Sequence, residues 1–403
     1  MSSPGSIVIV TDQHLSANPR VWKEADALAR NGYEVEIITR ANNAMRKKKD
    51  MAILQKLHPS VRYSPVVNAI KAEIPALRDI YYRSRLKLVL LAKRLGFESR
   101  YLLSTDPDKI YTESLSRNAD LYIAHVECGL FVGKHLIQKG KKVAFDFEDW
   151  YSRDYLSPVR AVKLLSSLEL HALQHGVYVT CPSVAMADAL KQTYNVADKP
   201  EALYNGFADS PVQEVANLRD DSMVNMVWFS QRVGPGRGLE KIAAVLKEVN
   251  TKVKLTLIGD CPPEYEATLN DVFPKEHKLE LVPPVSHTEL DNMLQQFDIG
   301  LALEEIYPES RNKTITNKIL QYLQAGIKVL ATNTDGQVEV AGCFPSSVRT
   351  VRTNDTTGWA AELDALIAEP VEREKIKEVY HKHFSWAAQE VKLLSLVEKA
   401  LKN

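Results

Sequence analysis

Short apolar segments alternate with segments of helical periodicity along almost all of the 403 residues, and this alternation constrains the fold most strongly. It predicts an α/β architecture, because successive parallel strands need a helical crossover between them. The expected strands lie at residues 6–11, 33–39, 121–126, 142–147, 177–181, 201–204, 225–229, 253–258, 279–282, 299–303 and 328–332. A polar, irregular segment at 208–222 interrupts the pattern, which then restarts. We therefore expect two similar α/β halves, each with a parallel sheet, joined by a linker.

The linker sets the expected domain boundaries. The first domain should cover residues 1–207 and the second residues 208–385, while 386–403 has the periodicity of a final helix with no strand after it. In open α/β sheets, ligands bind beyond the carboxyl ends of the strands. Two such sheets predict a ligand cleft between their carboxyl ends.

A turn rich in glycine and arginine follows the strand expected at 225–229. Its residues are Gln231, Arg232, Val233, Gly234, Pro235, Gly236, Arg237 and Gly238, and an apolar helical face begins at Leu239. Glycine allows a ligand to approach the backbone, the start of a helix offers free N–H groups, and arginine donates in a fork that suits phosphate. The turn therefore predicts an anion site, most simply for a diphosphate. A solvated turn without a ligand is the alternative interpretation.

A second polar constellation lies on the helix expected at 316–326, which Gly326 should end. Asn317 and Lys318 fall in its first turn, where helical N–H groups favour an anion. Gln321 lies three and four residues further on, so all three share one face. This face suits the ribose and phosphates of a nucleotide, and a merely solvated face is the alternative.

Composition excludes several classes of function. The 51 basic and 51 acidic residues cancel, so no overall field indicates a nucleic acid partner. Four widely separated cysteines fit no zinc spacing and favour a reducing compartment. No apolar run approaches the ~20 residues needed to span a bilayer, and the first residues lack a signal peptide pattern. We therefore expect a cytoplasmic protein.

One segment departs from this balance. Residues 41–105 contain 14 Lys or Arg and 4 Asp or Glu, so the segment carries a charge of +10. Within it, cationic side chains alternate with leucines across residues 78–100. A helix there could contact the inner face of an anionic membrane or a lipid-linked acceptor, or it could be an ordinary solvated helix.

The chain resembles the GT-B glycosyltransferases of the large retaining group called family 4, or glycosyl transferases group 1. Members carry a turn of the form Gly-Arg-Leu-x-x-x-Lys-Gly, which Arg232 and Arg237-Gly238 match in spacing with arginine in place of lysine. They also carry Asn-Lys-x-x-Glu-Tyr-x-x-x-Gly, which matches Asn317, Lys318, Gln321, Tyr322 and Gly326. Weaker echoes occur in order along nearly the whole chain. The resemblance implies two Rossmann-like domains facing a central cleft, with the last helix crossing back to the first domain.

The resemblance also implies site residues on the donor side. Arg232 and Arg237 would bind the diphosphate of a nucleotide-sugar, with Lys318 assisting, and Gln231, Gly236 and Asn317 would complete the site. Gln321 stands where the family has a glutamate that holds the ribose hydroxyls. A glutamine brings no charge, so its hydrogen bond to a hydroxyl should be weaker.

The first domain should supply the acceptor side. Glu148 and Asp149 follow a strand where relatives have a histidine and an acid, and His125 ends another strand. We expect these three as catalytic candidates, although acids at a helix start and a structural histidine are equally simple interpretations. Arg20, just inside the first helix, could reach a donor phosphate or the acceptor. The resemblance implies front-face substitution assisted by the leaving diphosphate, without a cofactor or a metal. Asp106-Pro107-Asp108 is expected to be a helix start rather than a metal motif.

The expected function is transfer of a sugar from a nucleotide-diphosphate sugar to a carbohydrate or lipid-linked acceptor, in polysaccharide or glycolipid assembly. Two alternatives stay open at this point. A GT-B sugar-nucleotide epimerase would keep the diphosphate site, and a non-catalytic homologue would bind a nucleotide or a partner protein. A dinucleotide-binding dehydrogenase is disfavoured, because the first strand leads into Thr11-Asp12-Gln13-His14 without Gly-x-Gly-x-x-Gly.

Overall fold

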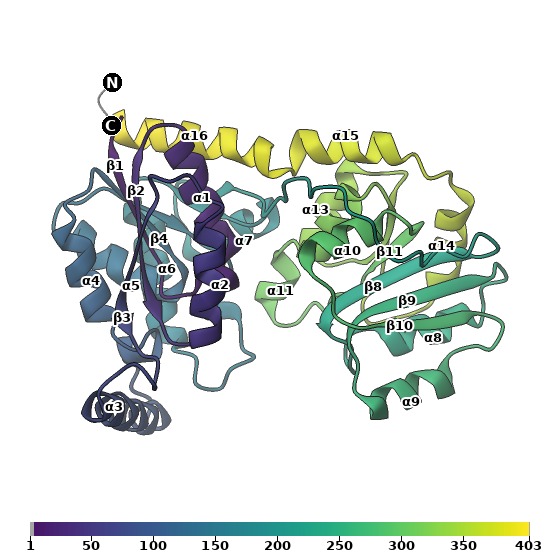
Figure 1. Cartoon of the computed structure of the whole chain (residues 1–403), viewed down its shortest axis with the longest axis horizontal. Helices are drawn as coiled ribbons and strands as arrows, with labels where there is room; N and C mark the ends of the chain where they lie inside the picture. The colour runs from purple at the N-terminus through teal and green to yellow at the C-terminus, as the bar shows by residue number, and fades with distance from the viewer. Residues whose placement is uncertain (1–3, 403) are drawn as a thin grey trace. The chain divides into compact units, whose positions relative to one another are not determined.

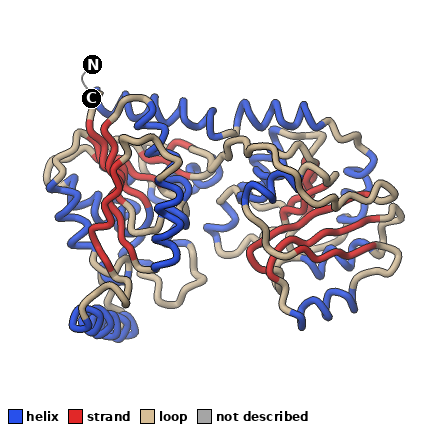
Figure 2. The backbone as a smooth tube through the Cα atoms, viewed as in Figure 1, coloured by secondary structure: helices blue, strands red, loops and turns tan. Residues whose placement is uncertain are grey.

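The computed structural model describes residues 4–402 and contains two compact units. The first unit runs to Leu203 and includes the chain from Glu390 onward, and the second comprises Tyr204–Gln389. Each unit is a parallel β-sheet flanked by helices (Figures 1 and 2). The predicted α/β architecture with two parallel sheets is therefore confirmed.

The first unit has seven parallel strands in the order β3-β2-β1-β4-β5-β6-β7. Their bounds are β1 (Ser6–Val10), β2 (Glu34–Ala41), β3 (Arg62–Asn68), β4 (Leu121–His125), β5 (Val143–Asp146), β6 (Val179–Cys181) and β7 (Glu201–Ala202). The helices are α1 (Pro19–Arg30), α2 (Ala44–Leu54), α3 (Ala76–Arg94), α4 (Pro107–Ser116), α5 (Val126–Ile137), α6 (Val162–His175) and α7 (Val184–Tyr194). From Glu390 onward, α16 (Trp386–Lys402) belongs to this unit, where Glu390 accepts a hydrogen bond of 2.8 Å from Arg30 Nη2.

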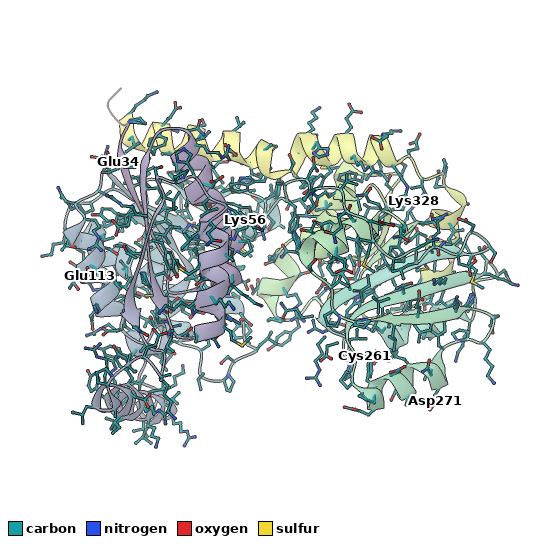
Figure 3. All side chains as sticks on the ribbon, in the orientation of Figure 1. Glu34, Lys56, Glu113, Cys261, Asp271 and Lys328 are labelled. Atoms are coloured by element: carbon teal, nitrogen blue, oxygen red, sulfur yellow. The ribbon has the colours of Figure 1, made fainter. Side chains whose placement is uncertain are left out.

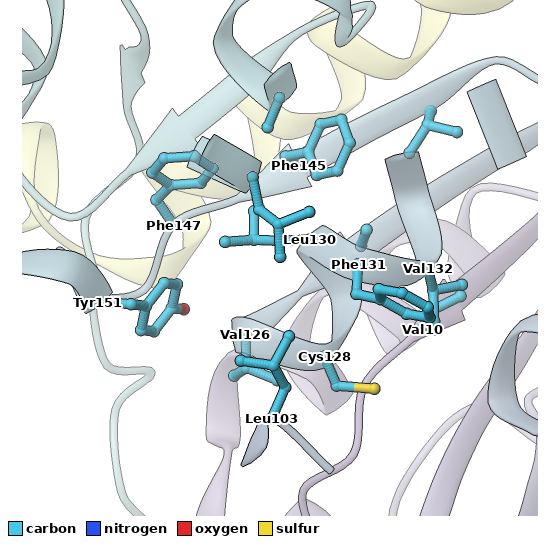
Figure 4. Packing of buried hydrophobic residues seen from close by; sticks show 14 of the residues in the cluster. Val10, Leu103, Val126, Cys128, Leu130, Phe131, Val132, Phe145, Phe147 and Tyr151 are labelled. Carbon is cyan, nitrogen blue, oxygen red and sulfur yellow. The ribbon is translucent and has the colours of Figure 1, made fainter. Parts of the chain in front are cut away.

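The core of the first unit explains why its central strands are apolar on both faces. Val10 of β1, Phe145 of β5 and Leu130 of α5 meet in one fully buried cluster (Figure 4). Burying a side chain of this size contributes about 1.5–3 kcal/mol. The same cluster reaches Val126 and Tyr151, which lie at the carboxyl ends of the strands. The core thus holds rigidly the edge of the sheet where polar residues gather.

The second unit has six parallel strands in the order β10-β9-β8-β11-β12-β13. Their bounds are β8 (Val224–Arg232), β9 (Val253–Asp260), β10 (Lys278–Val282), β11 (Ile299–Ala302), β12 (Lys328–Thr332) and β13 (Val348–Val351). The helices are α8 (Leu239–Leu246), α9 (Pro263–Val272), α10 (His287–Leu294), α11 (Glu309–Lys313), α12 (Asn317–Gln324), α13 (Asp335–Cys343), α14 (Trp359–Ala368) and α15 (Arg373–His383). In Figure 3, Cys261 lies just before α9, Asp271 lies in its last turn, and Lys328 marks the start of β12.

Local sequence signals set several helix ends as expected. Asn18 caps α1, with its side chain accepting from Val21 N, and Pro19 occupies the first helical position. Asp106 accepts from Lys109 N at the start of α4, and Ser286 accepts from Glu289 N at the start of α10. Gly326 follows α12 with a φ of 73°. The helix starts predicted at Asp106 and Ser286 are therefore confirmed.

Two strands, β3 and β13, have no counterpart among the predicted strands. Both lie at an edge of their sheet. Edge strands have one free side and need not be apolar, and β3 contains Arg62, Ser64 and Pro65 with only Val67 buried. Neither strand therefore carries the buried apolar run by which the other strands were predicted. None of the helices among residues 4–402 is both long and apolar enough to cross a bilayer.

Candidate functional site

Each sheet has a point where the strand order reverses, and ligands bind at such points in open α/β sheets. In the first unit the reversal lies between β1 and β4, and in the second it lies between β8 and β11. The end of β8 and the turn after it carry Gln231, Arg232, Gly236 and Arg237, whereas Glu148 and Asp149 follow β5, which is next to β4. Two candidate sites follow, one in each unit.

The first-unit site is a cavity of about 420 Å³, which we call the acidic cavity. Its lining comes from the ends of β1, β2, β4 and β5, from the segments that follow them and from one residue before α4: Asp12, Gln13, Arg40, Leu103, Val126, Glu127, Glu148, Asp149, Tyr151 and Arg160. Four carboxylates and two guanidinium groups face one another there. The acidic cavity therefore suits a ligand with several hydroxyl groups, which can both donate to carboxylates and accept from arginines.

Val126 gives the acidic cavity a strained backbone. It follows β4 directly and has a φ of 57°. A β-branched residue avoids this left-handed region, and such strain tends to occur at functional sites. The turn at Val126 starts α5 and places the Glu127 side chain in the cavity wall.

Beneath the cavity lies a buried network of charged groups. Arg20 Nε donates to Asp146 Oδ2 over 2.5 Å, Arg20 Nη1 donates to Leu203 O over 2.6 Å, and Glu24 Oε1 lies 3.8 Å from Arg20 Nε. The His125 ring bridges two carboxylates, with Glu24 Oε2 at 3.2 Å from Nε2 and Glu148 Oε1 at 3.0 Å from Nδ1. His125 is fully buried and does not line the cavity, but it fixes the carboxylate of Glu148, which does.

Burial and mutual charge shift the pKa values in this network. Burial opposes the protonated His125 ring, but the carboxylates of Glu24, Glu148 and Asp146 together outweigh it and raise the pKa of His125 to about 10. Burial raises the pKa of Glu24 to about 7 against the opposing charges of His125 and Arg20. The ring of His125 is therefore cationic at neutral pH and acts as a charged donor toward Glu148.

Two carboxyl groups of the cavity wall also titrate near neutrality. Burial raises the pKa of Glu127 to about 7, although Arg160 opposes the shift. Burial also raises the pKa of Asp149 to about 6. Groups that change charge near pH 7 in a cavity are suited to accept or donate a proton.

Glu24, His125 and Asp146 also have the composition of a metal site, with ligand atoms within 4.8 Å of one another. The guanidinium of Arg20 already donates to Asp146, however, and both nitrogens of His125 face carboxylates. Protein cations therefore compensate this cluster, and its geometry favours an ion-pair network over a metal.

The second-unit site begins at the glycine-rich turn after β8. Gly238 has a φ of 79°, and a Cβ there would lie 3.0 Å from Leu303 at the end of β11, so the turn packs closely on the reversal point. Arg232 and Arg237 are exposed and line a cavity of about 490 Å³ with Pro262, Glu264 and Tyr265. Within residues 4–402, neither arginine forms an ion pair with a carboxylate. Two cations without an ion-pair partner thus lie on the turn after β8, in a cavity shared with the segment that follows β9.

Helix α12 packs closely on β11 because β11 has a glycine where Tyr322 of the helix contacts it. A Cβ on Gly300 would lie 2.3 Å from the ring of Tyr322. Lys318, in the first turn of α12, reaches Glu304 after β11, with 2.8 Å between Nζ and Oε1, and lies 5.6 Å from the ring centre of Trp228. Asn317 Oδ1 accepts from Asn205 over 3.0 Å. The start of α12 thus presents polar groups next to the end of β11.

Gln321 is buried, and its amide group is engaged by α10. Its Nε2 donates to Asp291 Oδ1 over 3.2 Å and lies 3.5 Å from His287 Nδ1. Asp291 also accepts from Ser210. A neutral amide at position 321 therefore matches a carboxylate on the neighbouring helix.

The structure brings some predicted residues together and separates others. Glu148 and Asp149 share the acidic cavity, whereas Arg20 and His125 are buried and do not line it. Arg232 and Arg237 share one cavity; Gln231 and Gly236 are exposed on the same turn, and Asn317, Lys318 and Gln321 do not line that cavity. Their roles toward a substrate stay predictions.

Sequence reasoning did not single out several polar residues that the structure places at these sites. They are Asp12, Arg40, Glu127, Arg160 and Asp291. Asp12 and Glu127 each follow a strand, which is a usable signal at a reversal point. Arg160 and Asp291 carry no such signal, because neither directly follows a strand.

Solved structures share this architecture over nearly their whole length. A glycosyltransferase from Rickettsia africae is 14% identical, covers 99% of both chains and has a TM-score of 0.64. The Anabaena protein HepE, solved with UDP and glucose, is 13% identical over 98% of this chain and 99% of its own, with a TM-score of 0.63. A candidate UDP-N-acetylglucosamine 2-epimerase of Listeria monocytogenes is 11% identical over 98% and 96%, with a TM-score of 0.57. The protein therefore has the GT-B fold, the class of two Rossmann-like domains.

A protein-family model also matches part of the chain. Residues 228–369, from β8 to α14, match the family described as glycosyl transferases group 1. The matched segment includes both Arg232–Arg237 and α12, so the group 1 resemblance is confirmed for the second unit. No curated protein matches the sequence.

Proposed function

We propose that the protein transfers a sugar from a nucleotide-diphosphate sugar to an acceptor hydroxyl with retention of configuration. The observation that carries the proposal is the pair of guanidinium groups without ion-pair partners, Arg232 and Arg237, on the glycine-rich turn that follows β8, one of the two strands at the reversal point of the second sheet. Forked, permanently charged donors of this kind suit a diphosphate. HepE, which has the same fold, was solved with UDP, which supports a nucleotide of this class as the donor.

The proposed chemistry needs little more than positioning and charge. The bond between the anomeric carbon and the diphosphate oxygen breaks, and the acceptor oxygen forms a bond to the same face of that carbon. The acceptor proton passes to an oxygen of the leaving diphosphate, and Arg232 and Arg237 stabilise the charge that develops there. Glu148, oriented by His125, and Asp149 hold acceptor hydroxyls in the acidic cavity. We propose that no metal or cofactor takes part, and that the reaction belongs to cytoplasmic polysaccharide or glycolipid assembly.

Replacing Arg232 or Arg237 by Ala is expected to weaken the binding of a nucleoside diphosphate at least about tenfold, because each charged hydrogen bond contributes about 1.5–3 kcal/mol. Thermal shift with UDP, GDP and ADP, followed by calorimetric titration of the diphosphate that stabilises most, measures this effect. Arg352→Ala is the matched control, because that side chain is 78% exposed in the same unit. Diphosphate binding that survives in both Arg232→Ala and Arg237→Ala, or that is lost equally in Arg352→Ala, would contradict the donor site.

The same preparation separates the alternatives. An epimerase would convert the donor sugar with no acceptor present, whereas the proposed transferase needs an acceptor. A non-catalytic homologue would bind the diphosphate in an Arg232-dependent manner and convert no donor in either case. Release of the free diphosphate, with and without candidate acceptors, measures transfer, and chromatography of the remaining nucleotide-sugar detects an epimer.

We also propose that the protein contacts an anionic membrane through residues 78–100. Helix α3 lies at one end of the first unit, beyond β3 (Figure 1). Exposed apolar side chains recur on one stripe of α3 and the residue that follows it: Leu77, Ile80, Tyr81, Leu88, Leu91 and Leu95. Helical periodicity places Arg83, Lys87 and Arg94 along one side of the stripe and Arg78 along the other. An apolar stripe between rows of cations is typical of a helix that lies in the membrane interface.

Leu88→Asp combined with Leu91→Asp is expected to reduce binding to vesicles containing phosphatidylglycerol about tenfold or more, because each leucine loses its apolar burial and gains a repelled charge. Co-sedimentation measures the bound fraction. Val391→Asp is the control, since Val391 is 70% exposed on α16 and lies outside the stripe. Absence of wild-type binding, or an equal loss in Val391→Asp, would contradict membrane contact.

A further inference from the structure

A second cavity of the first unit has a different character from the acidic cavity. It measures about 380 Å³ and lies between α3, the end of β2 and residues 101–105. We call it the α3 cavity. Its charged and aromatic lining consists of Arg40, Arg83, Arg85, Asp79, Tyr82 and Tyr101. Arg40 pairs with Asp12 and Arg83 pairs with Asp79, so Arg85 leaves the α3 cavity with an excess of one positive charge.

Arg85 is the most firmly held of these cations. Its guanidinium lies 4.0 Å from the ring centre of Tyr101 and 5.3 Å from that of Tyr82. Its Nη1 donates to Tyr81 Oη over 3.1 Å and its Nη2 donates to Thr105 O. In the part of the chain that the structure describes, no carboxylate lies within ion-pair distance of Arg85. A stacked guanidinium without a counter-charge is pre-organised to bind an anion.

Arg40 connects the α3 cavity with the acidic cavity. It lines both, as does Leu103. Its Nη1 donates to Thr105 Oγ1 over 2.6 Å, and its Nη2 lies 3.4 Å from Asp12 Oδ2 in the acidic cavity. A ligand that fills both cavities therefore meets carboxylates at one end and arginines at the other, within a single unit.

Asp79 limits the charge but does not block the cavity. It pairs with Arg83 at 3.1 Å, and the side chain of Arg83 is 57% exposed. An exposed ion pair of this kind contributes little and rearranges readily. An anion entering from solvent can therefore use Arg83 in addition to Arg85.

We propose that the α3 cavity binds the phosphoryl or diphosphoryl group of the acceptor, with Arg85 as its main contact, while the sugar of the acceptor occupies the acidic cavity. This inference rests on the proposed transfer function and adds the class of acceptor, a sugar that carries phosphate. The phosphate belongs either to a lipid carrier in the membrane next to α3 or to a soluble sugar phosphate. Both sources share the same charged group.

The test uses full-length protein in which Arg232→Ala and Arg237→Ala silence the donor site. Inorganic pyrophosphate is titrated by calorimetry, with Arg85→Gln and Arg94→Gln added separately. Arg94 is an exposed cation of α3 that does not line the α3 cavity, so it controls for the general charge of the helix. Arg83→Gln is a second cavity variant that should not disturb folding, because its side chain is mostly exposed. Co-sedimentation with neutral phosphatidylcholine vesicles, with and without an isoprenyl diphosphate, distinguishes the lipid source.

We expect Arg85→Gln to weaken pyrophosphate binding at least about tenfold and Arg83→Gln to weaken it several-fold, while Arg94→Gln changes it less than about twofold. Vesicle binding that depends on both the isoprenyl diphosphate and Arg85 assigns the phosphate to a lipid carrier, and pyrophosphate binding alone assigns it to a soluble acceptor. Equal losses in Arg85→Gln and Arg94→Gln, or no Arg85-dependent binding in either assay, would overturn the proposal. UDP binding, measured with Arg232 and Arg237 intact, should be unchanged in Arg85→Gln. This measurement therefore tests the donor site independently of the α3 cavity.

Discussion

Replacing Arg20 by Ala is expected to lower the free energy of unfolding by about 3–5 kcal/mol near pH 8, the largest effect of any single substitution considered for this protein. Arg20 is 3% exposed and lies in the middle of the buried network. Its removal leaves Asp146 and Glu24 facing each other, with His125 and the neighbouring Lys23 as the remaining cations. An uncompensated charge in a buried site costs several kcal/mol because no water replaces the lost partner.

The loss should depend on pH in a defined direction. The pKa of Glu24 is already raised to about 7, and loss of the Arg20 charge should raise it further. A carboxyl group whose pKa is higher in the folded than in the unfolded state destabilises the protein above its folded pKa, and this penalty fades as pH falls toward 4.5. The difference between Arg20→Ala and wild type should therefore be clearly smaller near pH 6 than near pH 8.

Urea unfolding at both pH values measures the effect of Arg20→Ala. Arg30→Ala is the matched control on the same helix, because Arg30 pairs with Asp26 and Glu390 but is 45% exposed. Exposed pairs contribute about 0–1 kcal/mol, so the control should stay within that range. A loss in Arg20→Ala no larger than in Arg30→Ala, or one independent of pH, would show that the network is not held together by the guanidinium.

The buried network also illustrates what the sequence could and could not predict. Arg20 was predicted as a candidate phosphate or acceptor contact because it lies in the first turn of α1. Its actual partners, Asp146 and the carbonyl of Leu203, lie 126 and 183 residues away in the chain. Such distant pairings follow from the order of strands in the sheet, and no local sequence pattern predicts that order.

Features that depend on residues close together in the sequence were predicted more fully. Buried strands such as β1 and β12 are apolar on both faces because helices cover both, and the sequence shows this directly. The turn from Arg232 to Gly238 was recognised because its glycines and arginines lie within seven consecutive residues. The edge strand β3 was missed because it is mostly solvated, and the acidic cavity could not be assembled because Asp12, Glu127 and Arg160 come from three separate segments.

The sequence predicted the face shared by Asn317, Lys318 and Gln321 only in part. Periodicity placed the three residues together, but their partners, Asn205, Glu304 and Asp291, come from other elements. The partners decide the chemistry of each side chain. For Gln321 in particular, the carboxylate of Asp291 accounts for an amide where the related family has a glutamate.

Gln321→Glu is therefore expected to destabilise the protein rather than simply restore the family residue. The substitution would place a second carboxylate about where Gln321 Nε2 now lies, 3.2 Å from Asp291 Oδ1. Repulsion between the two carboxyl groups should raise the pKa for loss of their last proton. If this pKa rises by about two units, the free energy of unfolding falls by about 3 kcal/mol near pH 8. The penalty should fade below about pH 6, where the pair keeps that proton. The half-exposed His287, 3.5 Å from Asp291, compensates only in part.

Asp291→Asn in the same protein provides the decisive comparison. The amide introduced at position 291 can donate to the carboxylate introduced at position 321, which restores a hydrogen bond with the donor and acceptor exchanged. Gln321→Glu should therefore cost less than about 1 kcal/mol in the Asp291→Asn background. Urea unfolding of wild type, both single variants and the double variant measures the coupling between the two positions. If the proposed donor site is correct, the double variant should also bind UDP more tightly than Asp291→Asn alone, because a carboxylate forms a stronger bond to a ribose hydroxyl than an amide does. Additive effects of the two substitutions on stability would mean that the contact between Gln321 and Asp291 does not determine the residue at position 321.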